Sequence, residues 1–584
     1  MRNIGNLLFL PLAVAAAVSL GATDWPFIVI RHEMSVNVNS DKFEKIAEAH
    51  MRHPGACDEF WFATGARKPI PELEKEVATF ARYRPLCEKA GIVLSYQQGL
   101  TIGHGPRQDG NPRQGEQAFP EDAWQRRADG SFLGLLCPRS PFVLDYEREY
   151  AKAVIRVANP GSFWLDDDLR LGVVKPDGCF CDRCIAAFNA KTGGNVTRED
   201  LAKRLYDKNV AQDPIREAWC AFNAESLAVY AAEVRKAADE LGSPCRLGYQ
   251  SVSANRLYTA TGYGPLFEAL SGSGHAPVGI RPGDGFYDES KPRWMIFKCL
   301  GVAREAERCR DIQNVASVCY EQETYPRHLL HKSPGAIMTE CALALASGCD
   351  SLSLYWFPAE EPMPVEEYDS FLTTLLAARP YFERLAASTR RTRLGGLARY
   401  VGSAAAQTID YTLNDDADFD LACAGIPVTV AGPSASAWFL TEKSHREMTD
   451  ADKTAIASMP VVDISGMGKF PLVARRAKLL DDLDAATGVL FPVRVDLCRP
   501  LRILPRVRDD GRLDSVTFLN LSIGGTGEVK VRVRRPVSRT ALLQDATMSA
   551  PKPVVCADGA TPDEVVVPLS GLGPWQIATL FFGE

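Results

Sequence analysis

The stretch Gly161-Ser162-Phe163-Trp164-Leu165-Asp166-Asp167-Asp168 decides how this chain of 584 residues is interpreted, because an apolar run leads directly into three consecutive carboxylates. A short apolar run of this kind predicts a buried strand. A buried parallel strand that ends in acidic residues is typical of a (β/α)8 barrel, whose chemistry lies at the carboxyl ends of its strands. The rest of the chain supports this interpretation.

A short apolar run followed by an amphipathic helix recurs eight times between about residues 26 and 387. Strand–helix alternation predicts right-handed crossovers and a parallel sheet. An open doubly wound sheet is the alternative, but eight units with polar strand ends favour a closed (β/α)8 TIM barrel. The predicted strands are 26–30, 59–63, 91–96, 161–165, 245–249, 277–280, 314–320 and 350–356.

The chain is too long for one hydrophobic core, and its composition changes after about residue 390. We assign residues 24–388 to the barrel. Strand patterns that alternate with helical stretches predict a smaller α/β domain at 389–491. Short β-rich runs separated by Gly and Pro turns predict a C-terminal antiparallel β-sandwich at 492–584.

Residues 1–22 have the pattern of a secretory signal peptide: Arg2, an apolar run at 7–20, and small residues that end in Leu20-Gly21-Ala22. We therefore expect an exported protein, periplasmic or extracellular. The apolar run is too short to predict a stable membrane span. The net charge is −7 and no long basic run occurs, which argues against nucleic acid as a partner.

Two of the predicted strand ends carry acid clusters, Asp166 to Asp168 on the fourth and Glu321 with Glu323 on the seventh. In a closed barrel these two strands lie on opposite sides of the mouth. Cleavage of a glycosidic bond requires two facing carboxylates: one protonates the leaving oxygen, and the other attacks the anomeric carbon or activates water. The sequence thus predicts an exported glycoside hydrolase, with Asp167 or Asp168 as the acid and Glu321 or Glu323 as the nucleophile.

The remaining strand ends suit a polar ligand such as an oligosaccharide or glycoside. The side chains predicted to hydrogen-bond sugar hydroxyls are His32, Glu33, Gln97, Gln98, Gln250, Arg281 and Asp284. The aromatic side chains predicted to stack on a sugar ring are Trp61, Tyr96, Tyr249 and Trp356.

Cys179, Cys181 and Cys184 form a C-x-C-x-x-C motif after the fourth strand, and Cys137 lies 42 residues upstream of Cys179. Four thiolates would hold a structural zinc ion that closes the loops over the barrel mouth. The alternative is a disulfide with free thiols, which export would allow. No organic cofactor is predicted.

Two other functions compete with hydrolysis. The barrel could bind carbohydrate without cleaving it, or the aspartates could hold a divalent cation such as calcium in a metal-assisted lyase. Adjacent residues on a strand point to opposite faces, so the three aspartates cannot all converge on one ion.

Several motifs together resemble those of the family-42 β-galactosidases: Leu136-Cys137-Pro138-Arg139-Ser140-Pro141, the four-cysteine spacing, Tyr320-Glu321-Gln322 and Ala346-Ser347-Gly348-Cys349-Asp350. The order of barrel, α/β domain and small β domain is also similar. The resemblance implies a retaining mechanism, a zinc cluster and an α/β domain that builds a trimer.

Position by position, this resemblance matches Asp168 to the acid/base glutamate, Asp167 to the asparagine before it, and Glu321 to the nucleophile. The chain departs from the family's pattern at both aspartates. Asp168 is one methylene shorter than glutamate. Asp167 adds an anion that would raise the pKa of its neighbour. The resemblance therefore implies a divergent relative without fixing its sugar.

Overall fold

The computed structural model describes residues 25–33, 40–64, 67–104, 116–171, 178–252, 263–325, 330–356, 364–409, 416–429, 435–466, 473–487, 492–495 and 500–583. The predicted signal peptide at 1–22 lies outside these residues. Among the residues described, no helix combines the length and apolar character needed to cross a bilayer.

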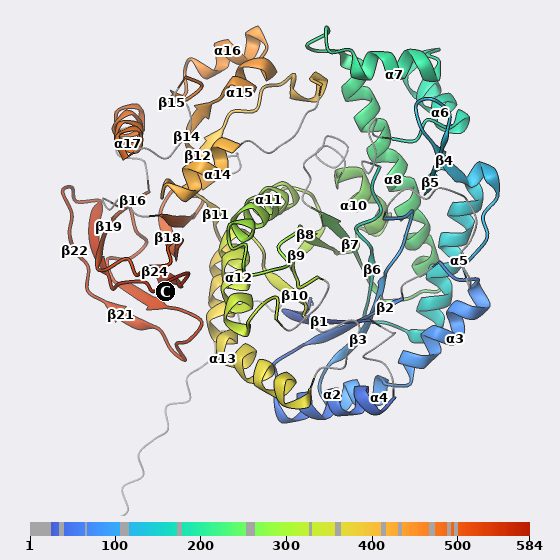
Figure 1. Cartoon of the computed structure of the whole chain (residues 1–584), viewed down its shortest axis with the longest axis horizontal. Coiled ribbons are helices and arrows are strands. Elements are labelled where there is room, and N and C mark those ends of the chain that lie inside the picture. Colours follow the sequence, from blue (N-terminus) through green and yellow to red (C-terminus); the bar gives the residue numbers. More distant parts are fainter. Residues whose placement is uncertain are drawn as a thin grey trace, which may run out of the picture.

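Eight parallel strands form a closed barrel in the order β1-β10-β9-β8-β7-β6-β3-β2, as predicted (Figure 1). Each strand contains or adjoins one of the apolar runs recognised in the sequence. The strands are β1 (Ile28–Glu33), β2 (Glu59–Thr64), β3 (Val93–Gln98), β6 (Ser162–Leu165), β7 (Arg246–Val252), β8 (Val278–Gly283), β9 (Val315–Glu323) and β10 (Ser351–Tyr355).

Helices surround the barrel (Figure 1). The connection between β2 and β3 forms two helices, α3 and α4, and Pro85 lies in the first turn of α4, where a missing N–H is tolerated. The helices of this layer are α2 (Ser40–Arg52), α3 (Ile70–Ala81), α4 (Arg84–Lys89), α5 (Pro141–Ala158), α8 (Pro214–Glu240), α10 (Tyr263–Ser271), α11 (Arg293–Arg310), α12 (Pro334–Ser347) and α13 (Val365–Arg390).

Alternation along the strands separates the barrel interior from the surface that faces the helices. Near the amino ends of the strands the interior is filled by Trp25, Trp61 and Trp164, with ring centroids of Trp61 and Trp164 4.4 Å apart. Trp61 Nε1 donates to the buried carboxylate of Glu59 at 2.7 Å. The prediction that Trp61 stacks on a sugar is therefore wrong, because its ring lies at the bottom of the barrel.

The long connections around β6 carry additional structure on one side of the barrel. The first contains the hairpin β4 (Trp124–Arg126) and β5 (Phe132–Leu136), preceded by the short η1 (Glu121–Ala123). The second contains α6 (Asp182–Thr192) and α7 (Arg198–Tyr206). These elements pack on α8 through a separate apolar cluster that includes Phe180, Phe188, Trp219, Phe222 and the four clustered cysteines.

Two smaller units follow the barrel, as predicted (Figure 1). The α/β unit has a parallel sheet in the order β13-β12-β14-β15, and the C-terminal unit has a six-stranded and a four-stranded sheet. The first unit contains β12 (Gly396–Arg399), η2 (Ala405–Gln407), α14 (Asp416–Cys423), β13 (Val428–Thr429), β14 (Ala435–Leu440), α15 (Glu442–Glu447), α16 (Asp450–Ile456), β15 (Val461–Asp463) and α17 (Val473–Thr487).

The C-terminal unit also recruits a strand from the connection after α13. That strand, β11 (Arg393–Leu394), pairs with β17, and buried Asp514 accepts hydrogen bonds from Ser388 and Arg391 at the end of α13. The other strands are β16 (Val493–Val495), β17 (Leu501–Val507), β18 (Leu513–Asn520), β19 (Val529–Arg534), β20 (Ala541–Gln544), β21 (Lys552–Val554), β22 (Ala557–Asp558), β23 (Glu564–Leu569) and β24 (Ile577–Phe581).

Candidate active site

The carboxyl ends of the strands bring a polar layer together inside the barrel. Neighbouring strands place Gln250 beside Arg281 and Glu321 beside Ser353 in register. Because paired residues in a parallel ladder share a face, these four side chains face the interior. All four are buried.

Arg281 on β8 joins the two acid clusters. Its Nη1 forms an ion pair with Glu321 Oε1 on β9, and its Nη2 lies 3.5 Å from Asp167 Oδ2, beyond the end of β6. The side chain of Arg281 is only 1% exposed, so both carboxylates meet a buried cation. Asp167 and Glu321 therefore face the same space, separated by a single guanidinium group.

A second arginine binds the same glutamate. Nη1 of Arg31 on β1 lies 2.7 Å from Glu321 Oε1, and Nε of Arg31 donates to Gln97 Oε1 at 2.8 Å. The guanidinium also lies over the ring of Tyr355, 4.4 Å from its centroid. Two cations and a fixed amide thus set the position of Glu321. Gln97 and Arg31 therefore both belong to the polar layer around Glu321, and Arg31 was not among the predicted residues.

The three aspartates have three different environments. Asp166 lies 3.0 Å from Nε2 of His104 and accepts a hydrogen bond from Gln97 at 3.4 Å. Asp167 lies 3.2 Å from Nη1 of Arg170 and 3.9 Å from Nδ1 of His104. His104 was not among the predicted residues, since no spacing in the loop after β3 distinguishes it from a surface histidine.

Asp168 is hydrogen-bonded to the loop after β3. Its carboxylate accepts hydrogen bonds from the backbone N–H groups of Thr101, at 2.8 and 3.0 Å, and Gly103, at 2.8 Å, and from the Thr101 hydroxyl. The residue is fully buried. The oxygens of Asp168 are therefore used by this loop, whereas Asp167 contacts Arg281.

Burial and neighbouring charges shift the pKa values of the clustered carboxyl groups in different directions. Burial and the charge of Asp166 raise the pKa of Asp167, while Arg281 and Arg170 act in the opposite direction. The pKa of Asp166 is lowered, because the hydrogen bond and charge of His104 outweigh burial. The hydrogen bond to Asp166 raises the pKa of His104 to about 10, so its imidazole is a cation at neutral pH. Burial and the charge of Asp166 also raise the pKa of Asp168, to about 6, but the oxygens of Asp168 bond the Thr101 loop. Asp167 is the carboxyl group with a raised pKa that also contacts Arg281.

Glu323 lies two residues beyond Glu321 on the same face of β9. It is only half-buried, and its charge acts on Arg281 and Tyr287. Its backbone carbonyl accepts a hydrogen bond from Lys332 Nζ at 2.7 Å. Glu323 is therefore at the outer edge of the site, whereas Glu321 is deeper and is bound by both arginines.

Several residues predicted to bind sugar lie instead between the strands and the helices, because they occupy the alternate positions of their strands. The Tyr96 hydroxyl bonds Thr64 and Tyr150, and the Tyr249 hydroxyl donates to the Leu169 carbonyl at 3.1 Å. Trp356 stacks on Phe371 of α13, with centroids 4.0 Å apart. These three predictions of sugar stacking are wrong.

Two polar residues share this outward orientation. His32 packs among Phe43, Phe60 and Phe62, and burial lowers its pKa to about 3. Gln98 donates to Glu147 on α5 at 3.0 Å. Neither is placed to bind substrate. Glu33 ends β1, but its side chain lies outside the described residues, and Asp284 accepts a hydrogen bond from the Gly285 N–H at 2.7 Å.

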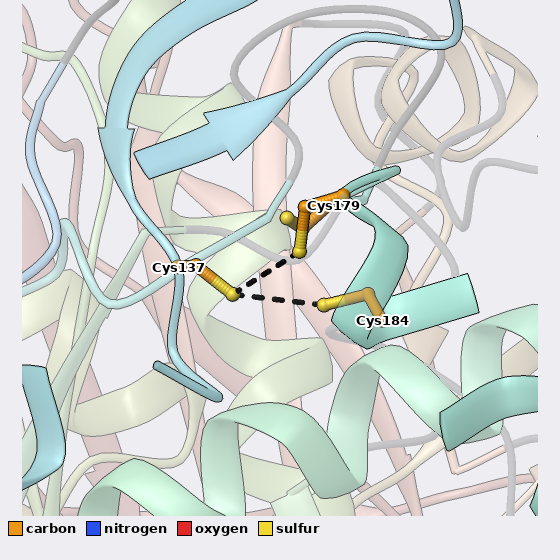
Figure 2. Close-up of side chains that lie close together, drawn as sticks. Cys137, Cys179 and Cys184 are labelled. Carbon is orange, nitrogen blue, oxygen red and sulfur yellow. Dashed lines mark hydrogen bonds between the residues drawn. The ribbon is translucent and has the colours of Figure 1, made fainter. Parts of the chain in front are cut away.

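The four predicted metal-ligating cysteines converge on one point. Figure 2 shows Cys137, from the segment after β5, directed toward Cys179 and Cys184 beside α6. The Cys137 sulfur lies 3.8 Å from that of Cys181 and 3.6 Å from that of Cys184, and all four sulfurs lie within 4.8 Å of one another. Four sulfurs around a zinc ion at about 2.3 Å would be about 3.8 Å apart. The donor set and its spacing fit a closed tetrahedral site.

No protein-family model matches the chain, and none of the curated proteins matches it. Solved structures do. The β-galactosidase of the psychrophilic Marinomonas ef1 gives a TM-score of 0.56 at 11% identity, over 95% of this chain and 100% of that one. The likeness shows the fold.

Two further solved structures have similar TM-scores. The α-L-fucosidase isoenzyme 2 of Paenibacillus thiaminolyticus gives a TM-score of 0.55 at 10% identity, over 96% of this chain and 100% of that one. A GH42 β-galactosidase from G. stearothermophilus gives a TM-score of 0.52 at 10% identity, over 95% of this chain and 98% of that one. The chain therefore has the barrel and domain order of these glycoside hydrolases, and the predicted likeness to the family-42 fold is confirmed.

Gly283 provides a direct test of how tightly Glu321 is held. A Cβ atom at Gly283 would lie far inside the contact distance of Glu321 Oε2. We expect Gly283→Ala to displace the carboxylate and to lower any activity that depends on the position of Glu321 about 100-fold, the order of effect expected for ångström-scale misplacement. Gly335→Ala, where a Cβ would contact nothing within 4 Å, is the matched control. Activity within twofold of wild type in Gly283→Ala would contradict this geometry.

Proposed function

We propose that the protein is a glycoside hydrolase that cleaves O-glycosidic bonds with retention, with Asp167 as acid/base and Glu321 as nucleophile. The observation that carries the proposal is the buried Arg281 guanidinium, which contacts both carboxylates. Two carboxyl groups on facing strand ends are what such a mechanism requires. The substrate class is an oligosaccharide or glycoside.

Each carboxyl group has surroundings that suit its proposed role. Arg31 and Arg281 favour the ionised form of Glu321, which can then attack the anomeric carbon. Asp167, with its raised pKa, gives its proton to the glycosidic oxygen as the bond to the leaving group breaks. Water then attacks the same carbon, Asp167 takes a proton from it, and the ester to Glu321 breaks.

The sugar in the cleaved position would be bound by the polar layer around Glu321. Gln250 is fully buried, and neither its Oε1 nor its Nε2 has a hydrogen-bond partner within the described part of the chain. Buried polar atoms are normally satisfied, so these two favour a ligand hydroxyl group as their partner. Gln97 and Arg31 would contribute on the opposite side of the layer.

One observation favours a second candidate function, the metal-assisted lyase. Ligand atoms of His104, Asp166 and Asp167 lie within 4.8 Å of one another. A divalent cation there would have to displace the proton of His104 and compete with Arg281 and Arg170 for Asp167. Product analysis separates the two reactions: hydrolysis adds water across the bond, whereas a lyase leaves an unsaturated sugar.

We expect Asp167→Asn and Glu321→Gln each to lower kcat at least 1000-fold on natural glycosides, because each removes a group that takes part in bond cleavage. Asp168→Asn is the matched control within the triplet. It should lower the thermal unfolding temperature while retaining more activity than Asp167→Asn, because it weakens the anchor of the Thr101 loop. The measurement is turnover across a panel of aryl glycosides and disaccharides.

The opposite ranking, with Asp168→Asn inactive and Asp167→Asn active, would contradict the assignment of the acid. Sugar binding without turnover of any glycoside by the wild-type protein would reject hydrolysis and support a carbohydrate-binding barrel.

The pH profile should respond to Arg170, which forms an ion pair with Asp167. A neighbouring cation favours the ionised carboxylate, so Arg170→Gln removes an influence that lowers the pKa of Asp167. Asp167 must be protonated to act as the acid. We therefore expect the basic limb of kcat/KM to move to higher pH by about 0.5 to 1 unit, and Arg170→Lys to leave it nearly unchanged. A shift to lower pH would contradict the role of Asp167.

We propose further that Cys137, Cys179, Cys181 and Cys184 hold one structural zinc ion. With four protein ligands, a bound zinc ion would have no open position and would take no part in the chemistry. It would join the segment after β5 to α6 within the apolar cluster that packs on α8, so that its binding free energy would add to the stability of this region.

Metal analysis should find one zinc ion per chain, and Cys137→Ser should lose it and unfold at a lower temperature. Cys556→Ser, in the C-terminal unit, is the matched control; it should retain the zinc ion and the unfolding temperature of the wild-type protein. A purified protein that contains no zinc and unfolds at the same temperature after Cys137→Ser would contradict the site.

Two expectations from the sequence remain proposals. We propose that residues 1–22 direct export to the periplasm or the medium, and that the α/β unit mediates a homotrimer. The N-terminal sequence of the secreted protein and its mass in solution test them.

A further inference from the structure

Two tyrosines lie at the outer edge of the acid site and have no role in the chemistry above. Tyr287 follows β8, which carries Arg281, and Tyr325 follows β9, which carries Glu321. Their rings meet edge to face, with centroids 5.8 Å apart at 61°. Tyr287 is 40% exposed and Tyr325 56% exposed, so both present aromatic surface to solvent.

The Tyr287 hydroxyl group is within electrostatic reach of the reacting groups. Burial, followed by the charges of Glu323, Asp167 and Asp284, raises its pKa to about 12. The phenol is therefore neutral and lies near carboxylates of both acid clusters, Glu323 and Asp167. The deeper side is occupied by Arg31 and Gln97.

The two loops that carry the tyrosines are fastened to each other. Lys332 is fully buried; its Nζ bonds the Glu323 carbonyl and lies 4.1 Å from the ring centroid of Phe286, next to Tyr287. Glu289 accepts hydrogen bonds from both N and Oγ of Ser333, at 2.9 and 2.8 Å. The described parts of the loops after β8 and β9, residues 284–292 and 330–333, are thus bonded to each other.

Lys332 is in turn held by a buried network behind β9. Its Nζ lies 2.7 Å from Oε2 of Glu340, whose Oε1 accepts a hydrogen bond from Tyr320 at 2.7 Å and lies 3.3 Å from Lys298 Nζ. A charge network of this kind is costly to rearrange. The tyrosine pair is consequently held in position before any ligand arrives, which lowers the entropy lost on binding.

We propose that Tyr287 and Tyr325 form a stacking platform for the leaving group of the substrate, a pyranose ring. This inference rests on the proposed function, because it is the proton donor Asp167 that defines the leaving-group side. An aromatic surface contacts the apolar face of a flat ring, and Tyr adds a hydroxyl group for hydrogen bonding. The solvent-exposed side is also the side from which a leaving group can depart.

The test is binding, measured by calorimetry or NMR in the full-length Glu321→Gln background so that no glycoside is consumed. The probes are matched methyl and phenyl glycosides of galactose, glucose, fucose and rhamnose. A stacked phenyl ring should bind about fivefold to tenfold more tightly than the methyl group for at least one sugar. Tyr325→Ala should abolish this advantage, and Tyr325→Phe should retain it.

Tyr206→Ala, which removes an exposed tyrosine from α7, is the control and should leave the ratio unchanged. A phenyl advantage that survives Tyr325→Ala, or no phenyl advantage for any sugar, would overturn the platform. Binding does not require cleavage, so the two proposals fail separately. If the wild-type protein hydrolyses no glycoside but the ratio depends on Tyr325, only the hydrolase proposal is rejected.

Discussion

The buried guanidinium of Arg281 is the constraint on which the rest of the site depends. It is almost fully removed from solvent, and burial together with Arg31 lowers its pKa to about 10, which still leaves it charged at neutral pH. A buried cation without partners would cost several kcal/mol. Arg281 therefore needs carboxylates from both sides of the barrel mouth, and Asp167 and Glu321 meet at this one group.

The three consecutive aspartates differ in function because each one has different hydrogen-bond and charge partners. Asp166 is kept ionised beside His104, and Asp168 holds the loop after β3, so that Asp167 is the one left at the opening. A third carboxylate facing the same space would add repulsion without adding a function. The three consecutive aspartates are thus one anchor, one counter-ion and one proposed acid.

Much of the fold could be predicted because apolar runs and helical periodicity are local properties, and the eight strands follow from them. The clustering of Cys179, Cys181 and Cys184 followed from ligand spacing, and the resemblance to family 42 added Cys137. The wrong predictions of sugar stacking have one cause. Residue type alone suggested stacking for Trp61, Tyr96, Tyr249 and Trp356. Depth in the barrel and alternation along the strand decide which side chains reach the barrel mouth. By the same alternation, Arg31 and not His32 faces inward. His104 carries no local signal, because only tertiary folding brings its loop to Asp166.

The most direct measurement is to trap the covalent intermediate with a 2-deoxy-2-fluoro glycoside of the sugar that the protein turns over. The labelled residue is then identified by peptide mass spectrometry. The arginine-bound position of Glu321 predicts a label on that residue alone, and none after Glu321→Gln. A label on Glu323, or on any of Asp166, Asp167 and Asp168, would contradict the pairing of Asp167 with Glu321.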